Sequence, residues 1–298
     1  MSFFGLKRMK ELSGNYQPSD RMNLQEKKQK RKKKKGFSGG VASDVGCVRG
    51  NNEDNYVLGK HMNICSADYS VASVDPIETS WGWQIAGVFD GMGGGEMGEL
   101  ASRDTASVFL GAFCHLSDTA TKTEVDQTIR KAFLEANNKI VAHQKKYKVF
   151  GTTGTVLCTD CNEIKFYHLG DSRAYLLRKN NLQQLTKDQT LAQMKVEVGM
   201  YQENDPAAEA DKHKLTEYIG RDWTCENIKP VESPWIPVEA GDYILLCSDG
   251  LYDMCSDEEI LEILRGNHSP QEKADELVKK ASTSGGEDNI TCVIVMFP

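Results

Sequence analysis

Acidic residues recur in this chain at the ends of short apolar segments, in a context rich in glycine. The apolar segments have the length and composition of buried β-strands. A strand end delivers a side chain to one rim of a sheet, and a neighbouring glycine lets the backbone turn tightly and approach a bound ion. Five places share this pattern: Glu53–Asp54, Asp90–Gly91, Asp171, Asp249–Gly250 and Asp288–Asn289.

Carboxylates gathered on one rim of a sheet would repel one another. Hard divalent cations with oxygen ligands, such as Mg²⁺ or Mn²⁺, relieve this repulsion. Two such ions about 3.5–4 Å apart can share a water and lower its pKa, which yields a hydroxide suited to phosphoester hydrolysis. The other interpretation is that each acid is a turn residue or helix cap, because Asp-Gly is common turn chemistry. The pattern alone leaves both interpretations open.

The order of the predicted elements favours one fold class. Predicted strands occur in runs, at 44–48, 55–58, 83–89, 155–159, 164–169, 173–177, 242–247 and 289–297. Long predicted helices come in pairs, at about 97–116 with 123–147, and at 256–264 with a helix that begins at Ser269–Pro270. Ser256 and Glu259 have the spacing of a capping box. This order predicts an α+β fold with mostly antiparallel sheets covered by helices, rather than βαβ alternation.

The first 36 residues differ from the rest in charge. Residues 1–35 hold twelve basic and three acidic residues, a net charge of +9, and eight of the nine residues from Lys27 to Lys35 are basic. Such a density of like charge predicts a flexible basic arm over 1–36. The remainder carries a net charge of −16 and is expected to form the folded domain, 37–298.

Three interpretations of the arm are open: a solvated tail without a role, an anchor for an anionic membrane or an acidic protein, and contact with nucleic acid. Polybasic attraction to an anionic surface is worth about 1 kcal/mol per Lys or Arg, so the arm suffices for reversible recruitment. The acidic domain and the absence of a groove-reading motif argue against specific nucleic-acid binding.

The remaining composition bears on location. The 298 residues include no apolar run of 18, so we expect no transmembrane helix. Nine cysteines, an odd number, are scattered along the chain without a secretory signal. We therefore expect free thiols and a cytoplasmic protein. Cys158 and Cys161 have a zinc-like spacing, but without a second pair they are more simply two cysteines near a hairpin turn.

Six short motifs carry a more specific signal. Together, and in this order, they resemble the metal-dependent protein serine/threonine phosphatases of the protein phosphatase 2C type, over roughly residues 40–298. The motifs are VRGNNEDN (48–55), VFDGMGG (88–94), GTTGT (151–155), LGDSRAY (169–175), CSDGLYD (247–253) and GEDNIT (286–291).

The resemblance implies a fold and a metal centre. The implied fold has two central, mostly antiparallel β-sheets packed face to face as a sandwich, with helices on both outer faces. The implied centre holds two Mn²⁺ or Mg²⁺ ions, with Asp90 bridging both and the Gly91 carbonyl completing one coordination shell. Glu53 would act on the metal through water. The implied carboxylate ligands are Asp54, Asp90, Asp249 and Asp288.

The resemblance also implies the groups that handle phosphate. Arg49 stands where the family places its phosphate-binding arginine, and a guanidinium fork matches two phosphate oxygens at once. Asn289 is expected to help position phosphate or water. Asp171 resembles the ligand that, together with Asp249, holds a third, weaker ion in bacterial members.

Two departures from the wider family bear on mechanism and specificity. Animal and plant members usually have histidine where this chain has Met92, so the form here resembles the bacterial branch and the general acid must be another group. Residues 188–235 stand where bacterial members carry a variable flap. Within it, Asp188-Gln189-Thr190 replaces a more usual Asp-His-Ser.

The implied function is hydrolysis of phosphoserine and phosphothreonine on proteins, by attack of a metal-bridging hydroxide on phosphorus. Phosphorylated proteins are the expected partners, together with a cognate serine/threonine kinase. A non-catalytic relative and a nucleic-acid-associated protein are the alternative hypotheses. The first would normally have lost metal carboxylates, which are all present here.

Overall fold

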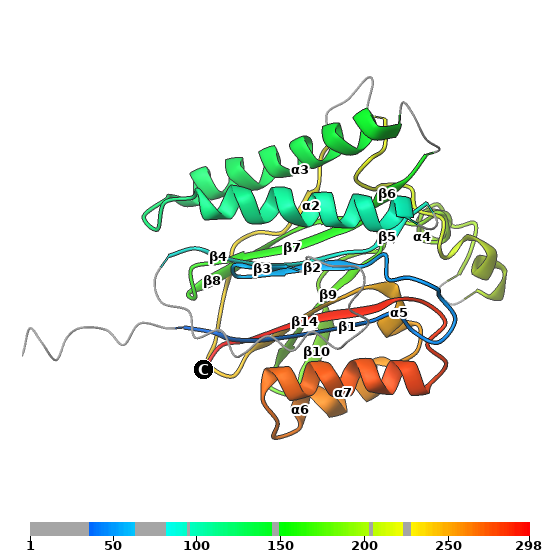
Figure 1. Cartoon of the computed structure of the whole chain (residues 1–298). Helices are drawn as coiled ribbons and strands as arrows, with labels where there is room; N and C mark the ends of the chain where they lie inside the picture. The colour runs from blue at the N-terminus through cyan, green and yellow to red at the C-terminus, as the bar shows by residue number, and fades with distance from the viewer. Residues whose placement is uncertain (1–35, 63–81, 94–95, 145–148, 203–204, 223–227) are drawn as a thin grey trace, which may run out of the picture. The chain divides into compact units, whose positions relative to one another are not determined.

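A computed structural model of the chain describes residues 36–62, 82–93, 96–144, 149–202, 205–222 and 228–298. The chain divides into two units, Met1–Lys34 and Lys35–Pro298. Residues 1–35 of the predicted basic arm lie outside the described residues. The second unit contains every helix and strand described below (Figure 1).

One sheet of the second unit brings the two ends of the domain together. Its five strands are antiparallel, and β14 lies between β1 and β13. Register pairs Ser43 with Thr291 and Cys247 with Cys292. In spatial order the strands are β1 (Ser38–Asp44), β14 (Ile290–Met296), β13 (Tyr243–Cys247), β9 (Arg173–Arg178) and β10 (Asn181–Gln184).

The other large sheet is also antiparallel and has seven strands. Its strands are β2 (Asn55–Leu58), β3 (His61–Met62), β4 (Gln84–Phe89), β7 (Gly154–Thr159), β8 (Glu163–Leu169), β11 (Val231–Glu232) and β12 (Ile236–Pro237). β11 and β12 both pair with β8 at the edge. A small ribbon of β5 (Gly91–Met92) and β6 (Gly151–Thr152) continues beyond the ends of β4 and β7.

Helices cover both outer faces of the two sheets (Figure 1). α2 (Glu96–Cys114) and α3 (Lys122–Gln144) pack on the seven-stranded sheet, where the rings of Phe89, Phe109 and Phe133 stack in sequence. α6 (Asp257–Arg265) and α7 (Pro270–Thr283) pack on the five-stranded sheet. A third apolar cluster, which includes Val41, Val88 and Val293, fills the space between the sheets. The predicted four-layer α/β/β/α fold is thereby confirmed.

The local sequence signals locate most elements well. Ser256 and Ser269 both form capping boxes, with Glu259 and Glu272 three residues on. The first strand is where the prediction was wrong: β1 ends at Asp44, and residues 46–48 form a turn. The glycine-rich segment that precedes Asp44 has a weak strand signal, and pairing with β14 makes it a strand. The predicted strands also lack β10, because the Asn180–Asn181 pair at its start is typical of a turn.

Short helices occupy the segment predicted as a flap. They are α4 (Leu191–Glu197) and a 3₁₀ helix, η1 (Pro206–Asp211), capped by Thr190 and Asp205. A bridge from Thr152 to Ile219 attaches this segment to the domain, and a bridge from Thr190 to Leu215 lies within the segment. β11 lies inside the predicted range 188–235 yet belongs to the seven-stranded sheet.

Two further expectations concern cysteines and membranes. Cysteines 47, 114, 158, 161, 247, 255 and 292, which are those within the described ranges, are free thiols. No helix in the described part of the chain has the length and apolar character needed to cross a membrane.

Candidate active site

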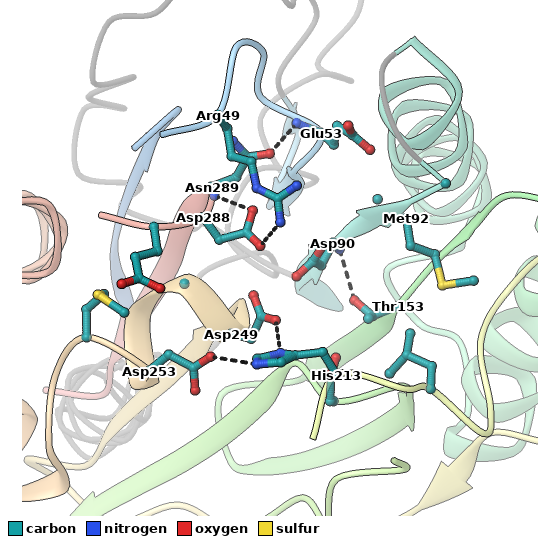
Figure 2. A pocket seen from close by; sticks show the side chains of 17 residues that line it. Arg49, Glu53, Asp90, Met92, Thr153, His213, Asp249, Asp253, Asp288 and Asn289 are labelled. Carbon is teal, nitrogen blue, oxygen red and sulfur yellow. Dashed lines mark hydrogen bonds and ion pairs between the residues drawn. The ribbon is translucent and has the colours of Figure 1, made fainter. Parts of the chain in front are cut away.

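The ends of both large sheets open into one cavity of about 460 Å³. Figure 2 shows side chains from several distant segments converging there. All the predicted site residues line it except Asp54, which is buried. The predicted residues that line it are Arg49, Glu53, Asp90, Gly91, Asp171, Asp249, Asp288 and Asn289.

Asp90 follows β4 directly and is held by the GTTGT motif. Its backbone N–H donates to Thr153 Oγ1 over 2.9 Å. Its carbonyl oxygen accepts from the Thr153 N–H and from the Thr152 hydroxyl, both over 2.8 Å. These bonds fix the backbone of Asp90 while leaving its carboxylate directed into the cavity (Figure 2).

Asp54 lies just before β2 and is only 2% exposed. The Ser248 hydroxyl donates to Asp54 Oδ2 over 2.7 Å. Within the described residues, Asp54 Oδ1 is buried and has no hydrogen-bond partner, and the same is true of Asp249 Oδ1. A buried carboxylate oxygen without a partner is costly, and a bound cation would satisfy it.

The electrostatics of the site favour cations. Burial raises the pKa of Asp54 and of Asp90 well above the ordinary value, and the neighbouring carboxylates raise both further. Asp249 and Asp288 are among the neighbours that act on each of them. Four neighbouring carboxylates, two of which have a buried oxygen without a partner in the described residues, form a hard oxygen-donor set, which fits Mg²⁺ or Mn²⁺.

Glycine permits the close approach of three segments beside Asp90. A side chain at Gly91 would collide with the Gly98 carbonyl, and one at Gly98 would collide with the Glu53 carboxylate. Glu53 therefore lies against the first turn of α2, at the cavity wall rather than among the four aspartates. This position agrees with the expected action through water, which stays a prediction.

Arg49 stands at the exposed mouth of the cavity. Its Nη2 donates to Asp288 Oδ2 over 2.6 Å, and the arginine side chain is 53% exposed. An exposed ion pair of this kind contributes little to stability. The guanidinium can therefore exchange Asp288 for a phosphate when Asp288 is engaged elsewhere.

Asn289 has a structural task that the sequence did not indicate. Its Oδ1 accepts from the Glu53 N–H over 2.7 Å, and its Nδ2 donates to the Val45 and Asn51 carbonyls, both over 2.9 Å. Asn289 thus holds the loop that carries Arg49 and Glu53. The expected contact with phosphate stays a prediction.

Comparison with known proteins agrees with this geometry. A family model described as Protein phosphatase 2C matches residues 41–195 and 236–290. These ranges contain every predicted site residue and leave out most of the flap. The chain belongs to the protein phosphatase 2C family.

Similar 2C-type proteins come from bacteria. The chain is 33% identical over 211 residues to the serine/threonine phosphatase stp of Listeria welshimeri, which covers 70% of this chain and 82% of that protein. The serine/threonine phosphatase structure from S. agalactiae matches with a TM-score of 0.75 and 27% identity, over 88% of this chain and 100% of the other. The catalytic domain of PstP, solved in complex with two manganese ions, matches with a TM-score of 0.65 and 31% identity, over 88% of this chain and 99% of the other.

The structure adds residues to the site of this 2C-type chain that the motifs did not indicate. His213, from the flap, lies between Asp249 and Asp253 (Figure 2). His213 falls outside the ranges that match the family model. The sequence did contain a signal for Asp253. Because α5 (Asp249–Tyr252) is a single helical turn, a side chain four positions after Asp249 lies on the same side of that turn as Asp249.

Asp171 and Met92 complete the cavity wall. Asp171 is 5% exposed, and burial raises its pKa, with a further contribution from Asp249. The Tyr252 hydroxyl donates to the Asp171 carbonyl, which leaves the carboxylate free for the cavity. Met92 offers no proton, so the structure is consistent with a general acid elsewhere.

Proposed function

We propose that Asp54, Asp90, Asp249 and Asp288 hold two divalent ions with which this protein hydrolyses phosphoserine and phosphothreonine on other proteins. Membership of the 2C family makes the chain a metal-dependent serine/threonine protein phosphatase. The observation that carries the residue assignment is the pair of buried oxygens, Asp54 Oδ1 and Asp249 Oδ1, that have no hydrogen-bond partner in the described structure.

When bound, the two ions would lower the pKa of a water molecule and offset the charge of the phosphoryl group. Arg49 binds two phosphate oxygens and sets the phosphorus in line with the attacking water. Thr152 and Thr153 keep Asp90 from shifting as charge develops. Ser248 keeps Asp54 in one orientation. Preorganisation of this kind supplies a large part of the lowering of the barrier.

A third ion is part of the proposal. Asp171 and Asp249 both line the cavity, and their mutual repulsion would be relieved by a cation between them. The Gly91 carbonyl and Glu53 complete the set of groups assigned to the metal centre, Glu53 acting through water.

The partners and location follow from the family and the sequence. Phosphoproteins are the substrates, and a serine/threonine kinase supplies them. We infer a cytoplasmic location from the free cysteines. The basic arm makes the chain suited to peripheral contact with an anionic membrane or an acidic protein.

Phosphate release from phosphothreonine and phosphotyrosine peptides tests the proposal, with Mn²⁺, Mg²⁺ or EDTA. We expect release from phosphothreonine with Mn²⁺ or Mg²⁺ and none with EDTA. Asp90→Asn should lower turnover by orders of magnitude, and the exposed Asp118→Asn serves as the matched control. Full activity of a folded Asp90→Asn variant, or full activity of the wild type in excess EDTA, would contradict the two-metal hypothesis.

A further inference from the structure

A histidine from the flap completes a cluster of three metal-ligand side chains beside the four aspartates. His213, Asp249 and Asp253 each offer one ligand atom, and these atoms lie within 4.8 Å of one another. This is the one such group that the described residues form. Figure 2 shows the imidazole between the two carboxylates.

The distances suit a coordination shell. His213 Nδ1 lies 3.2 Å from Asp249 Oδ2, and Nε2 lies 3.7 Å from Asp253 Oδ2. In an octahedral shell with bonds of about 2.1 Å, neighbouring ligand atoms are about 3.0 Å apart and opposite ones about 4.2 Å. Small rotations of the exposed imidazole would place one of its nitrogens and two carboxylate oxygens around one ion.

Two independent observations indicate that a ligand belongs here. Asp249 Oδ1 is buried without a partner on one side, while Oδ2 faces His213 on the other, so this carboxylate can serve the paired ions and a further ion at once. Asp171 is 95% buried and lines the same cavity, and its carboxylate forms no hydrogen bond or ion pair with another side chain of the described residues.

We propose that His213 is a nitrogen ligand of the third ion, which it would bind together with Asp171, Asp249 and Asp253, and that it makes this site selective for a transition metal such as Mn²⁺ over Mg²⁺. The proposal rests on the function proposed above and adds to it a ligand from outside the family motifs. Imidazole nitrogen binds first-row transition ions, including Mn²⁺ and Co²⁺, more readily than Mg²⁺, which prefers oxygen ligands and water.

This ligand would couple the third ion to the flap. The backbone bonds of Leu191 to Lys214 and of Thr216 to Gln189 hold the loop that carries His213 within the flap. The Gln189 N–H in turn donates to the Gly170 carbonyl, which lies outside the flap. An ion bound by His213 and Asp249 would link this loop to the end of β13. The flap would then be better ordered with Mn²⁺ than with Mg²⁺.

A competing explanation is that His213 is only a counter-ion for crowded acids. Lys212 clearly has that role, since its Nζ donates to Asp253 Oδ1 over 2.6 Å and an ammonium cannot bind a cation. The two explanations predict opposite effects. Removing a ligand weakens binding of the third ion, whereas removing a competing cation strengthens it.

Mn²⁺ and Mg²⁺ binding by the full chain, measured by calorimetry and equilibrium dialysis, separates the explanations. We expect His213→Ala to weaken the third Mn²⁺ site about tenfold or more, while the two tighter sites and Mg²⁺ binding change little. Lys212→Met should strengthen the third site, and the remote, exposed His268→Ala should change nothing. Equal or tighter Mn²⁺ binding by His213→Ala would overturn the proposal.

Pulsed electron paramagnetic resonance of the Mn²⁺-loaded wild type gives a second readout that needs no variant. We expect a ¹⁴N coupling from one directly bound imidazole, and its absence with all three sites filled would overturn the proposal. If the proposed function itself were wrong, the result would differ from failure of the His213 proposal. The wild type would then bind no tight pair of Mn²⁺ ions and would release no phosphate.

Discussion

At the scale of single residues, Arg49 and Asp288 share a contact that catalysis must rearrange. In the structure the guanidinium donates a hydrogen bond to Asp288, a carboxylate that we assign to the metal centre. Cation binding by Asp288 would weaken this pair and turn the guanidinium toward substrate. Under the proposed function, more of the Arg49 guanidinium would become available for phosphate once ions neutralise the carboxylates.

Arg49→Ala should raise KM and lower kcat, because the arginine binds phosphoryl oxygens whose charge is redistributed in the transition state. Loss of a bidentate charged contact predicts a fall in kcat/KM of about 100-fold. Arg49→Lys should restore little, because lysine lacks the fork. Steady-state kinetics on a phosphothreonine peptide measure this, with Arg103→Ala, another exposed arginine, as control. Wild-type kinetics in Arg49→Lys would contradict the bidentate role.

Ser248→Ala should weaken Mn²⁺ binding about tenfold while the fold survives. Ser248 Oγ donates to Asp54 Oδ2 and accepts from the Thr291 N–H over 2.9 Å, so the serine orients a buried ligand. The variant would remove one of the two side-chain donors of Asp54, the other being Thr291. Calorimetric titration with Mn²⁺ gives the affinity, and Ser248→Thr tests whether the hydroxyl alone is sufficient. Unchanged affinity in Ser248→Ala would show that Asp54 needs no orienting bond.

At the scale of elements, β8 contains a histidine that the catalytic site does not use. His168 is 2% exposed, and its ring nitrogens lie 2.9 Å from Thr155 Oγ1 and 3.1 Å from the Lys187 carbonyl oxygen. Its burial within the strand indicates a packing role. Burial lowers the pKa of His168 to about 4 from the ordinary 6.5.

This shift makes the domain sensitive to acid. Between about pH 6.5 and pH 4 the unfolded chain binds a proton at His168 that the folded chain does not bind, so the free energy of unfolding falls as pH falls. The full effect is about 3 kcal/mol. Thermal unfolding of the wild type and of His168→Gln should show the variant gaining relative stability from pH 7 to pH 5. A pH-independent difference between the two would mean that His168 is not neutral in the fold.

At the scale of the whole molecule, the chain joins a basic segment to an acidic catalytic domain. Phe37 is 2% exposed and its ring packs against that of Phe297, with the centroids 6.2 Å apart. The folded domain therefore begins no later than Phe37. A shortened chain has to keep this residue.

Deleting residues 1–36 should leave kcat for a short phosphopeptide unchanged, since every residue assigned to the site follows Phe37. Binding to vesicles with anionic lipids should fall on deletion, and binding by the full chain should fade as salt rises. Peptide hydrolysis and vesicle co-sedimentation of both proteins measure this. Loss of peptide hydrolysis by a folded, shortened chain would place the arm in the active site.

Local chemistry made much of the site predictable. A strand followed by Asp-Gly has the same consequence wherever it occurs: a carboxylate at a sheet rim, beside backbone that can approach an ion. Asp90 and Asp249 needed no knowledge of packing to be recognised as candidates. The capping boxes at Ser256 and Ser269 were predictable for the same reason, because all their partners lie within three residues.

Contacts between distant segments were decided only by the tertiary structure. β1 is a strand because β14, about 250 residues later, supplies its hydrogen bonds. Asn289 holds a loop near residue 50, and His213 reaches Asp249 across 36 residues of chain. The spacing of apolar residues along the sequence does not predict such pairs. It indicates burial and local hydrogen bonds, but not which surfaces of distant segments pack together. The sequence by itself predicted carboxylates at strand ends, and the resemblance to the family indicated Arg49 and Asn289. Only packing decided that Asn289 holds the backbone of Glu53 and that His213 stands beside Asp249, because those contacts join segments far apart in the chain.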